Sequence, residues 1–151
     1  MPLSRLIYYS HRRIPPREGF QAIKQILDVS IRNNRRSAVT GYMVFDDRIF
    51  AQVLEGEPEA VQSTYARIGQ DRRHGDLVLL DSSRQSVRAF PDWAMGATLW
   101  LDEMTSLLSR RGLTGLDPER LGAGGVLELA LALHAREAQR KKQAREKSLQ
   151  F

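Results

Sequence analysis

In this 151-residue chain, the first residue whose type points to chemistry is Gln52, which lies within the run FAQVLEG at positions 50–56. Side chains alternate between the two faces of a strand, so Gln52 shares a face with Phe50 and Leu54, residues typical of a buried core. A buried primary amide must satisfy its donors and its acceptor, and each hydrogen bond left unmade costs about 1–3 kcal/mol. A polar partner is therefore expected beside Gln52.

Two further polar residues are predicted to face the same space. Tyr8 lies in the alternating stretch 3–10, which is typical of a strand. Asn34 continues a helical stripe of apolar residues, spaced by three and four, that consists of Phe20, Ile23, Leu27 and Ile31. Taken singly, the three have ordinary interpretations as a core tyrosine, a capping asparagine and a satisfied core glutamine. Taken together around one gap between helix and sheet, they suit a planar ligand with polar edges.

Periodicity and turn signals indicate the elements that must position these residues. Strands are predicted at 3–10, 38–46, 49–56, 76–81 and 93–101, and two helices begin near Pro16 and Pro58. This order, β-α-β-β-α-β-β, predicts an α+β fold: a ferredoxin-like sheet with an added strand and two helices on one face. The first and third strands are central neighbours in such a sheet, which allows Tyr8 to lie beside Gln52.

The C-terminal third of the chain departs from this pattern. Residues 102–111 indicate a short helix, the glycines between 112 and 125 a flexible bend, and residues 126–134 the start of a last helix. A sheet with helices on one side leaves its other face bare, so we expect the C-terminal helices to cover it. The chain is thus predicted to consist of a first unit, 1–101, and a helical extension with a basic tail, 102–151.

Composition excludes several classes of function. The chain has no cysteine, which excludes disulfides and thiolate chemistry, and its three histidines are scattered, so no metal site is expected. Of the net charge of +5, residues 136–147 contribute +4, from six basic and two acidic residues. Such a run is more typical of a solvated tail than of a nucleic-acid surface. Without a signal peptide or a long apolar run, we expect a cytoplasmic protein that does not enter a membrane.

Five motifs follow one another along the chain: RLIYYS at 5–10, NN at 33–34 followed by TG at 40–41, FAQVLEG at 50–56, RIGQDRRH at 67–74 and FPDWAM at 90–95. In their order and spacing, they resemble the BLUF family of blue-light sensors that use flavin. The resemblance covers residues 3 to about 100. It implies a photosensory module rather than an enzyme, with a flavin held between the two helices and the sheet. The flavin is usually FAD, and FMN is the alternative.

The resemblance also implies roles for single residues. Tyr8 matches the family's photoactive tyrosine, Gln52 its switching glutamine, and Asn34 the asparagine that hydrogen-bonds the edge of the isoalloxazine ring. Positions near the pyrimidine side and the ribityl–phosphate region are matched by Asn33, Arg67 and His74. Trp93 and Met95 fall on the fifth strand, where the family couples the glutamine to the sheet.

The flavin's stacking walls are expected from Ile23, Leu27 and Ile68, which lie on helical stripes facing the gap and suit a simple core equally well. Arg67 is as consistent with a solvated arginine as with a phosphate contact. These residues complete the predicted site.

The leading functional hypothesis is a short blue-light receptor, expected to form a homo-oligomer, that signals to a separate partner such as a cyclic-nucleotide or cyclic-di-GMP enzyme. One rival is an enzyme of the acylphosphatase type. It would need a glycine-rich anion-binding loop after the first strand, and HRRIPP at 11–16 is not one. A second rival, a nucleic-acid-binding module, would show aromatic residues among the basic ones, and the tail has none before Phe151.

Overall fold

The computed structural model describes residues 2–14, 19–91, 96–97 and 101–149, except for the side chains of residues 19–23, 27, 97 and 101. The elements follow the predicted order, with two helices after the fifth strand. They are β1 (Leu3–Arg12), α1 (Gly19–Ser37), β2 (Thr40–Phe45), β3 (Ile49–Gly56), α2 (Pro58–Gly69), β4 (His74–Gln85), β5 (Gly96–Ala97), α3 (Leu101–Arg110) and α4 (Pro118–Leu149).

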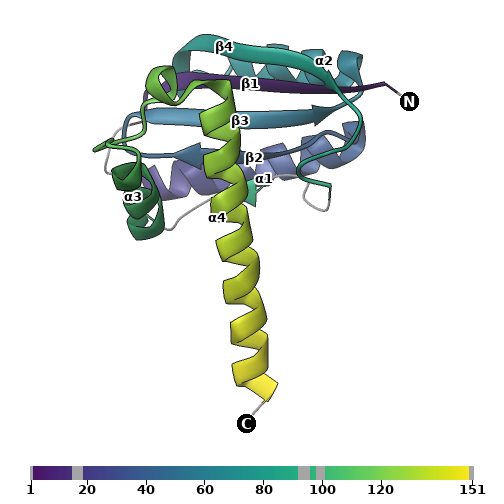
Figure 1. Ribbon diagram of the computed structural model, residues 1–151. Helices are drawn as coiled ribbons and strands as arrows, with labels where there is room; N and C mark the ends of the chain where they lie inside the picture. Colours follow the sequence, from purple (N-terminus) through teal and green to yellow (C-terminus); the bar gives the residue numbers. More distant parts are fainter. Residues whose placement is uncertain (1, 15–18, 92–95, 98–100, 150–151) are drawn as a thin grey trace.

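The five strands form one sheet in the order β4-β1-β3-β2-β5 (Figure 1). The pairs β4–β1, β1–β3 and β3–β2 are antiparallel, and the short β5 runs parallel to β2. The prediction that the first and third strands are neighbours is confirmed, and the register places Tyr8 directly opposite Gln52.

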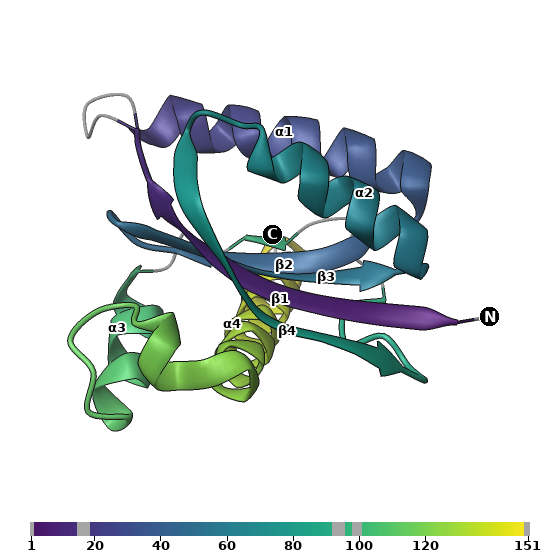
Figure 2. The ribbon, with the colours of Figure 1, turned by 90° about the horizontal axis from the view of Figure 1, so that it is seen from above.

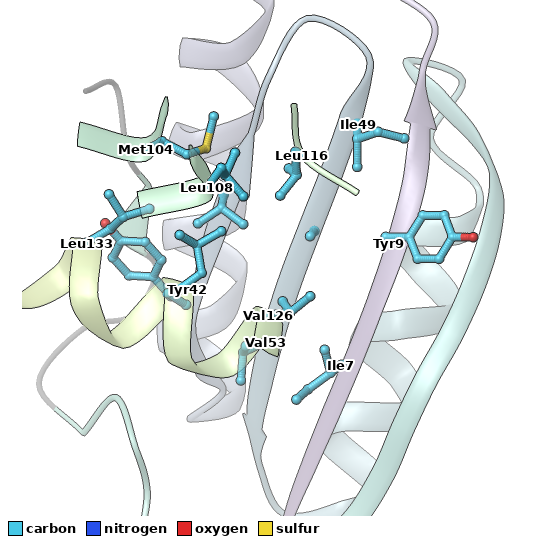
Figure 3. Packing of buried hydrophobic residues seen from close by; sticks show 14 of the residues in the cluster. Ile7, Tyr9, Tyr42, Ile49, Val53, Met104, Leu108, Leu116, Val126 and Leu133 are labelled. Carbon is cyan, nitrogen blue, oxygen red and sulfur yellow. The ribbon is translucent and has the colours of Figure 1, made fainter. Parts of the chain in front are cut away.

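Helices α1 and α2 cover one face of the sheet, and α3 and α4 lie on the other (Figure 2). Because successive strand residues point to opposite faces, each strand contributes to two cores. The core under α1 and α2 contains Leu6, Tyr8, Val39, Met43, Phe45, Phe50, Leu54 and Val61. The core under the C-terminal helices includes Ile7, Tyr9, Tyr42, Val53, Val126 and Leu133 (Figure 3). The predicted fold class, with both faces covered, is confirmed.

Strand β4 is longer than predicted, because it runs from His74 to Gln85 rather than over 76–81. Its polar second half shows no hydrophobic alternation. Those residues pair with the start of β1, where Leu3 lies opposite Gln85 and Ile7 opposite Asp81. Backbone hydrogen bonds to a neighbouring strand thus extend β4 beyond its apolar part.

The glycine-rich bend was predicted to last until residue 125, and this was wrong. Helix α4 begins at Pro118, and the break is confined to Gly122, whose φ of 69° lies in the left-handed region that favours glycine. Proline suits a first helical turn, and the Asp117 carbonyl accepts the Leu121 N–H at 3.0 Å. Burial of Val126 and the leucines that follow outweighs the cost of about 1 kcal/mol for each interior glycine.

Helix α4 is attached to the sheet near its start and leaves it near its end. The Tyr9 hydroxyl on β1 donates a hydrogen bond to the Glu119 carboxylate, which, with burial, raises the pKa of Tyr9 to about 12. Beyond Glu137, residues 138–149 are all exposed, and the helix extends away from the sheet (Figure 1). Among the helices described, none is both long and apolar enough to cross a bilayer.

Candidate functional site

A cavity is lined by residues of α1, α2 and the sheet. The lining residues are Tyr8, Ile26, Val29, Ser30, Asn33, Asn34, Met43, Phe50, Gln52, Thr64, Arg67, Ile68, Asp71, Arg73 and His74.

The polar partner expected beside Gln52 is Tyr8. Its phenolic hydroxyl donates a hydrogen bond to Gln52 Oε1, and the side chains come from directly paired positions on β1 and β3. Both residues are buried, with exposed fractions of 2% and 4%. The pair therefore forms a hydrogen-bonded floor of the cavity, well shielded from water.

The environment of Tyr8 keeps its phenol protonated. Burial, followed by the neighbouring Tyr65 and Asp71, raises the pKa of Tyr8 well above its ordinary value near 10. The ring of Tyr65 meets that of Tyr8 edge-on, with the ring centres 5.2 Å apart. At neutral pH, Tyr8 is therefore a hydrogen-bond donor to Gln52 and not a phenolate.

Asn34 lies in the last turn of α1 and is 2% exposed, with Asn33 beside it on the cavity wall. The predicted stripe brings Asn34 to the cavity, because residues three and four apart share one face of a helix. From α2, Arg67 and Ile68 also line the cavity. The structure thus brings seven predicted residues together around one space: Tyr8, Asn33, Asn34, Gln52, Arg67, Ile68 and His74.

His74 lines the same cavity, but both of its ring nitrogens already have protein partners. Nε2 lies 2.7 Å from the carbonyl oxygen of Ile68, and Nδ1 lies 2.6 Å from the Ser10 hydroxyl. A carbonyl can only accept, so in the neutral ring Nε2 carries the proton and Nδ1 accepts from Ser10. His74 therefore ties the start of β4 to α2 and β1 at the cavity wall.

Four predicted residues cannot be placed. Trp93 and Met95 lie outside the described residues, and so do the side chains of Ile23 and Leu27, although their backbone belongs to α1.

Sequence reasoning missed eight lining residues: Ile26, Val29, Ser30, Met43, Phe50, Thr64, Asp71 and Arg73. Helical spacing from Asn33, Asn34 and Ile68 could have identified those on α1 and α2. Met43 pairs directly with Gln52 across β2 and β3, and Phe50 shares its face. Asp71 and Arg73 form an ion pair that lowers the pKa of Asp71, and no periodic pattern marks such a turn.

The cavity matches a planar heterocycle with polar edges. Aliphatic side chains from two helices, such as Ile26 and Ile68, offer apolar walls. The buried amides of Asn34 and Gln52 offer donors and acceptors to a ring edge. These residues fit a flavin's isoalloxazine ring, which is apolar on its faces and polar along one edge.

The family model for BLUF, described as sensors of blue light using FAD, matches residues 3–96. The chain belongs to the BLUF family. Members of this family bind a flavin and sense blue light, which agrees with the walls and polar edge of the cavity. The match spans β1 to the start of β5 and includes every lining residue of the cavity.

A curated relative is the blue light- and temperature-regulated antirepressor BluF of Escherichia coli strain K12. It is 38% identical over 88 residues, which are 58% of this chain and 21% of BluF. The chain thus spans about a fifth of the length of this relative.

Two solved structures extend the likeness to the C-terminal helices. The dark state of BlrB, a BLUF protein, has a TM-score of 0.71 at 28% identity and covers 87% of this chain and 96% of its own. The photo-activated state of BlsA has a TM-score of 0.79 and covers 87% of this chain and 94% of its own. At 24% identity, BlsA shows the fold alone.

Proposed function

We propose that this protein is a blue-light receptor in which Tyr8 and Gln52 are the switch, and that it signals to a separate partner protein. One observation carries the proposal: the buried hydrogen bond from the Tyr8 phenol to Gln52 Oε1 in a cavity that fits a flavin. Tyr8 can give up an electron and a proton, and Gln52 can reverse the direction of its hydrogen bonds.

Tyr8 is the electron donor in this proposal. A bound flavin supplies, after absorbing blue light, a strong one-electron oxidant. Loss of an electron to the flavin would make the phenolic proton of Tyr8 acidic, so a proton that the raised pKa holds in the dark could pass along its hydrogen bond to Gln52 Oε1. The electron and the proton both return to Tyr8, so no net oxidation remains and no substrate is consumed.

The lasting change in this proposal is a new hydrogen-bond arrangement of Gln52. In the dark its Oε1 accepts from Tyr8, and this arrangement loses its donor when the phenolic proton leaves. Rotation or tautomerisation of the amide then offers a different end to Tyr8 and to the cavity, because an amide carries a donor and an acceptor on opposite sides. A charged side chain would lock one state, and an apolar one could form neither.

The remaining lining residues hold the flavin. We propose that Asn33 and Asn34 contact the polar edge of the isoalloxazine ring and that Ile68, with Ile23 and Leu27, packs against its faces. Arg67 is exposed at the cavity and can reach a ribityl or phosphate group, and His74 shapes that wall. We propose FAD, which the family description names, and FMN shares the isoalloxazine part that these residues contact.

The signal is proposed to leave through Trp93 and Met95 towards the C-terminal helices. Helix α4 contacts β1, β2, β3 and β4 on the face opposite the cavity, so a shift in the sheet reaches it directly.

The partner we propose is a cyclic-nucleotide or cyclic-di-GMP enzyme. A repressor is the second candidate, because the relative BluF is an antirepressor. We further propose a cytoplasmic homo-oligomer.

The proposed function is tested on the purified protein by absorption spectroscopy. We expect a yellow protein whose flavin spectrum shifts to longer wavelength under blue light and returns in the dark, and whose released cofactor chromatographs as FAD. A colourless protein that takes up neither FAD nor FMN would refute flavin binding. Flavin bleaching without a reversible shift would refute the switch.

The exit of the signal is tested by hydrogen exchange in the dark and under light. We expect light to change amide protection within residues 102–134, while the helices around the cavity stay nearly unchanged, because low-stability elements respond first. Equal protection of residues 102–134 in both states, with a change elsewhere, would place the output surface elsewhere.

A further inference from the structure

Glu55 is a completely buried carboxylate on the same strand as Gln52 but on the opposite face of the sheet. We propose that Glu55 is a positioning residue that ties the switch strand β3 to helix α4 through Phe90. The inference rests on the proposed function, since it concerns how a change at Gln52 reaches the C-terminal helices.

The Glu55 carboxylate holds two consecutive backbone N–H groups of the segment before β5. Its Oε1 accepts from Phe90 N at 2.9 Å and from Ala89 N at 3.0 Å, and its Oε2 also lies 3.0 Å from Ala89 N. Arg5 on β1 completes the site, with Nε and Nη2 both 2.9 Å from Oε2. Every contact is a donor aimed at a carboxylate, so an amide at this position would oppose some of them.

A second anchor fixes the same segment to the same end of β2 and β3. The Arg88 guanidinium donates to the Thr40 hydroxyl at 2.7 Å, to the Glu55 carbonyl at 3.1 Å and to the Ala38 carbonyl at 2.9 Å. The segment 88–90 is thus fastened to β3 by side chain and backbone, and its position follows that of the strand end.

Phe90 links the segment 88–90 to helix α4 by ring contacts. Its ring is fully buried and stacks on Tyr42 of β2, with the ring centres 5.5 Å apart, while His134 of α4 meets it edge-on at 5.5 Å. His134 also lies edge-on to Tyr42, at 5.6 Å. The three rings join the segment, the sheet and α4, and Figure 3 shows Tyr42 beneath α4 near Leu133.

The connection to α4 starts at Gln52 in the cavity. Gln52 and Glu55 are three residues apart, which is about 10 Å along a strand, and their odd separation puts them on opposite faces. Tyr42 is the neighbour of Met43, which lines the cavity and pairs with Gln52. Movement of β3 at Gln52 is therefore transmitted across the sheet to the carboxylate that holds Phe90.

The test compares light-minus-dark hydrogen exchange of α4 in the flavin-loaded wild type and in Glu55→Gln. We expect the variant to keep its flavin spectrum and its light-induced shift, because Glu55 does not line the cavity, and to lose the light-dependent change in α4. Phe90→Leu, which leaves the carboxylate contacts in place and removes one of the three rings, is expected to lose the same change. It provides the test if Glu55→Gln does not fold.

Arg5→Gln is the matched control. It removes the charged partner of Glu55 but leaves both backbone N–H contacts, so its α4 response is expected to match the wild type. A response of wild-type size in Glu55→Gln, or in Phe90→Leu, would overturn the inference. So would a loss of response in Arg5→Gln equal to that in Glu55→Gln. A wild type with no reversible spectral shift would instead refute the proposed function.

Discussion

Tyr8→Phe is expected to bind flavin with its fold intact and to lose the light-induced spectral shift completely. The ring is buried and packs against Tyr65, and phenylalanine keeps both the bulk and this contact. What is removed is the hydroxyl that donates to Gln52, and with it the transferable proton and the easily oxidised phenol. Absorption spectra recorded before and after blue light measure the effect.

The neighbouring tyrosine offers a matched control for this substitution. Tyr9 lies on the opposite face of β1, where its hydroxyl donates to Glu119 rather than to Gln52. Tyr9→Phe is expected to keep the full spectral shift while losing about 1 kcal/mol of stability with that hydrogen bond. A normal photocycle in Tyr8→Phe would remove Tyr8 from the mechanism.

Gln52→Leu is expected to abolish switching and also to destabilise the protein. The surrounding face is apolar, so leucine fits. The buried Tyr8 hydroxyl, however, loses the acceptor to which it donates. An unsatisfied buried hydroxyl costs about 1–3 kcal/mol, which chemical unfolding without flavin can measure.

The double variant Tyr8→Phe/Gln52→Leu separates the two effects. Replacing both partners with apolar groups of similar shape is nearly neutral, so the double variant is expected to be more stable than Gln52→Leu. It should show no spectral shift. A Gln52→Leu protein that still forms the red-shifted lit state would contradict the bridging role, and additive stability changes would show that the two side chains do not interact.

Several features of the site follow from residue patterns alone. Alternation in 50–56 places Gln52 among core residues, and alternation in 3–10 places Tyr8 on a matching strand face. The order of strands and helices makes these two strands neighbours, and helical spacing carries Asn34 to the same gap. These are local periodicities combined with one topological rule, so no knowledge of distant contacts is required.

The motif at 50–56 also includes Glu55, whose role no pattern reveals. Alternation assigns it to the far face of the sheet, where a charged residue would ordinarily meet solvent. Its burial depends on Arg5 and on the backbone of Ala89 and Phe90, which lie about 50 and 35 residues away along the chain. Only the folded chain brings these donors together.

Tertiary structure likewise decided where helix α4 begins and which hydrogen-bond partners the buried polar side chains have. Local propensity favours a bend over the glycines before residue 126, but burial under the sheet keeps α4 helical from Pro118 with a break at Gly122. His74 acquires its partners, Ser10 and Ile68, from two other elements. By itself the sequence determined which face each residue occupies, because that depends on neighbours along the chain. The hydrogen bonds and helix limits depend on contacts between distant segments, which exist only after folding.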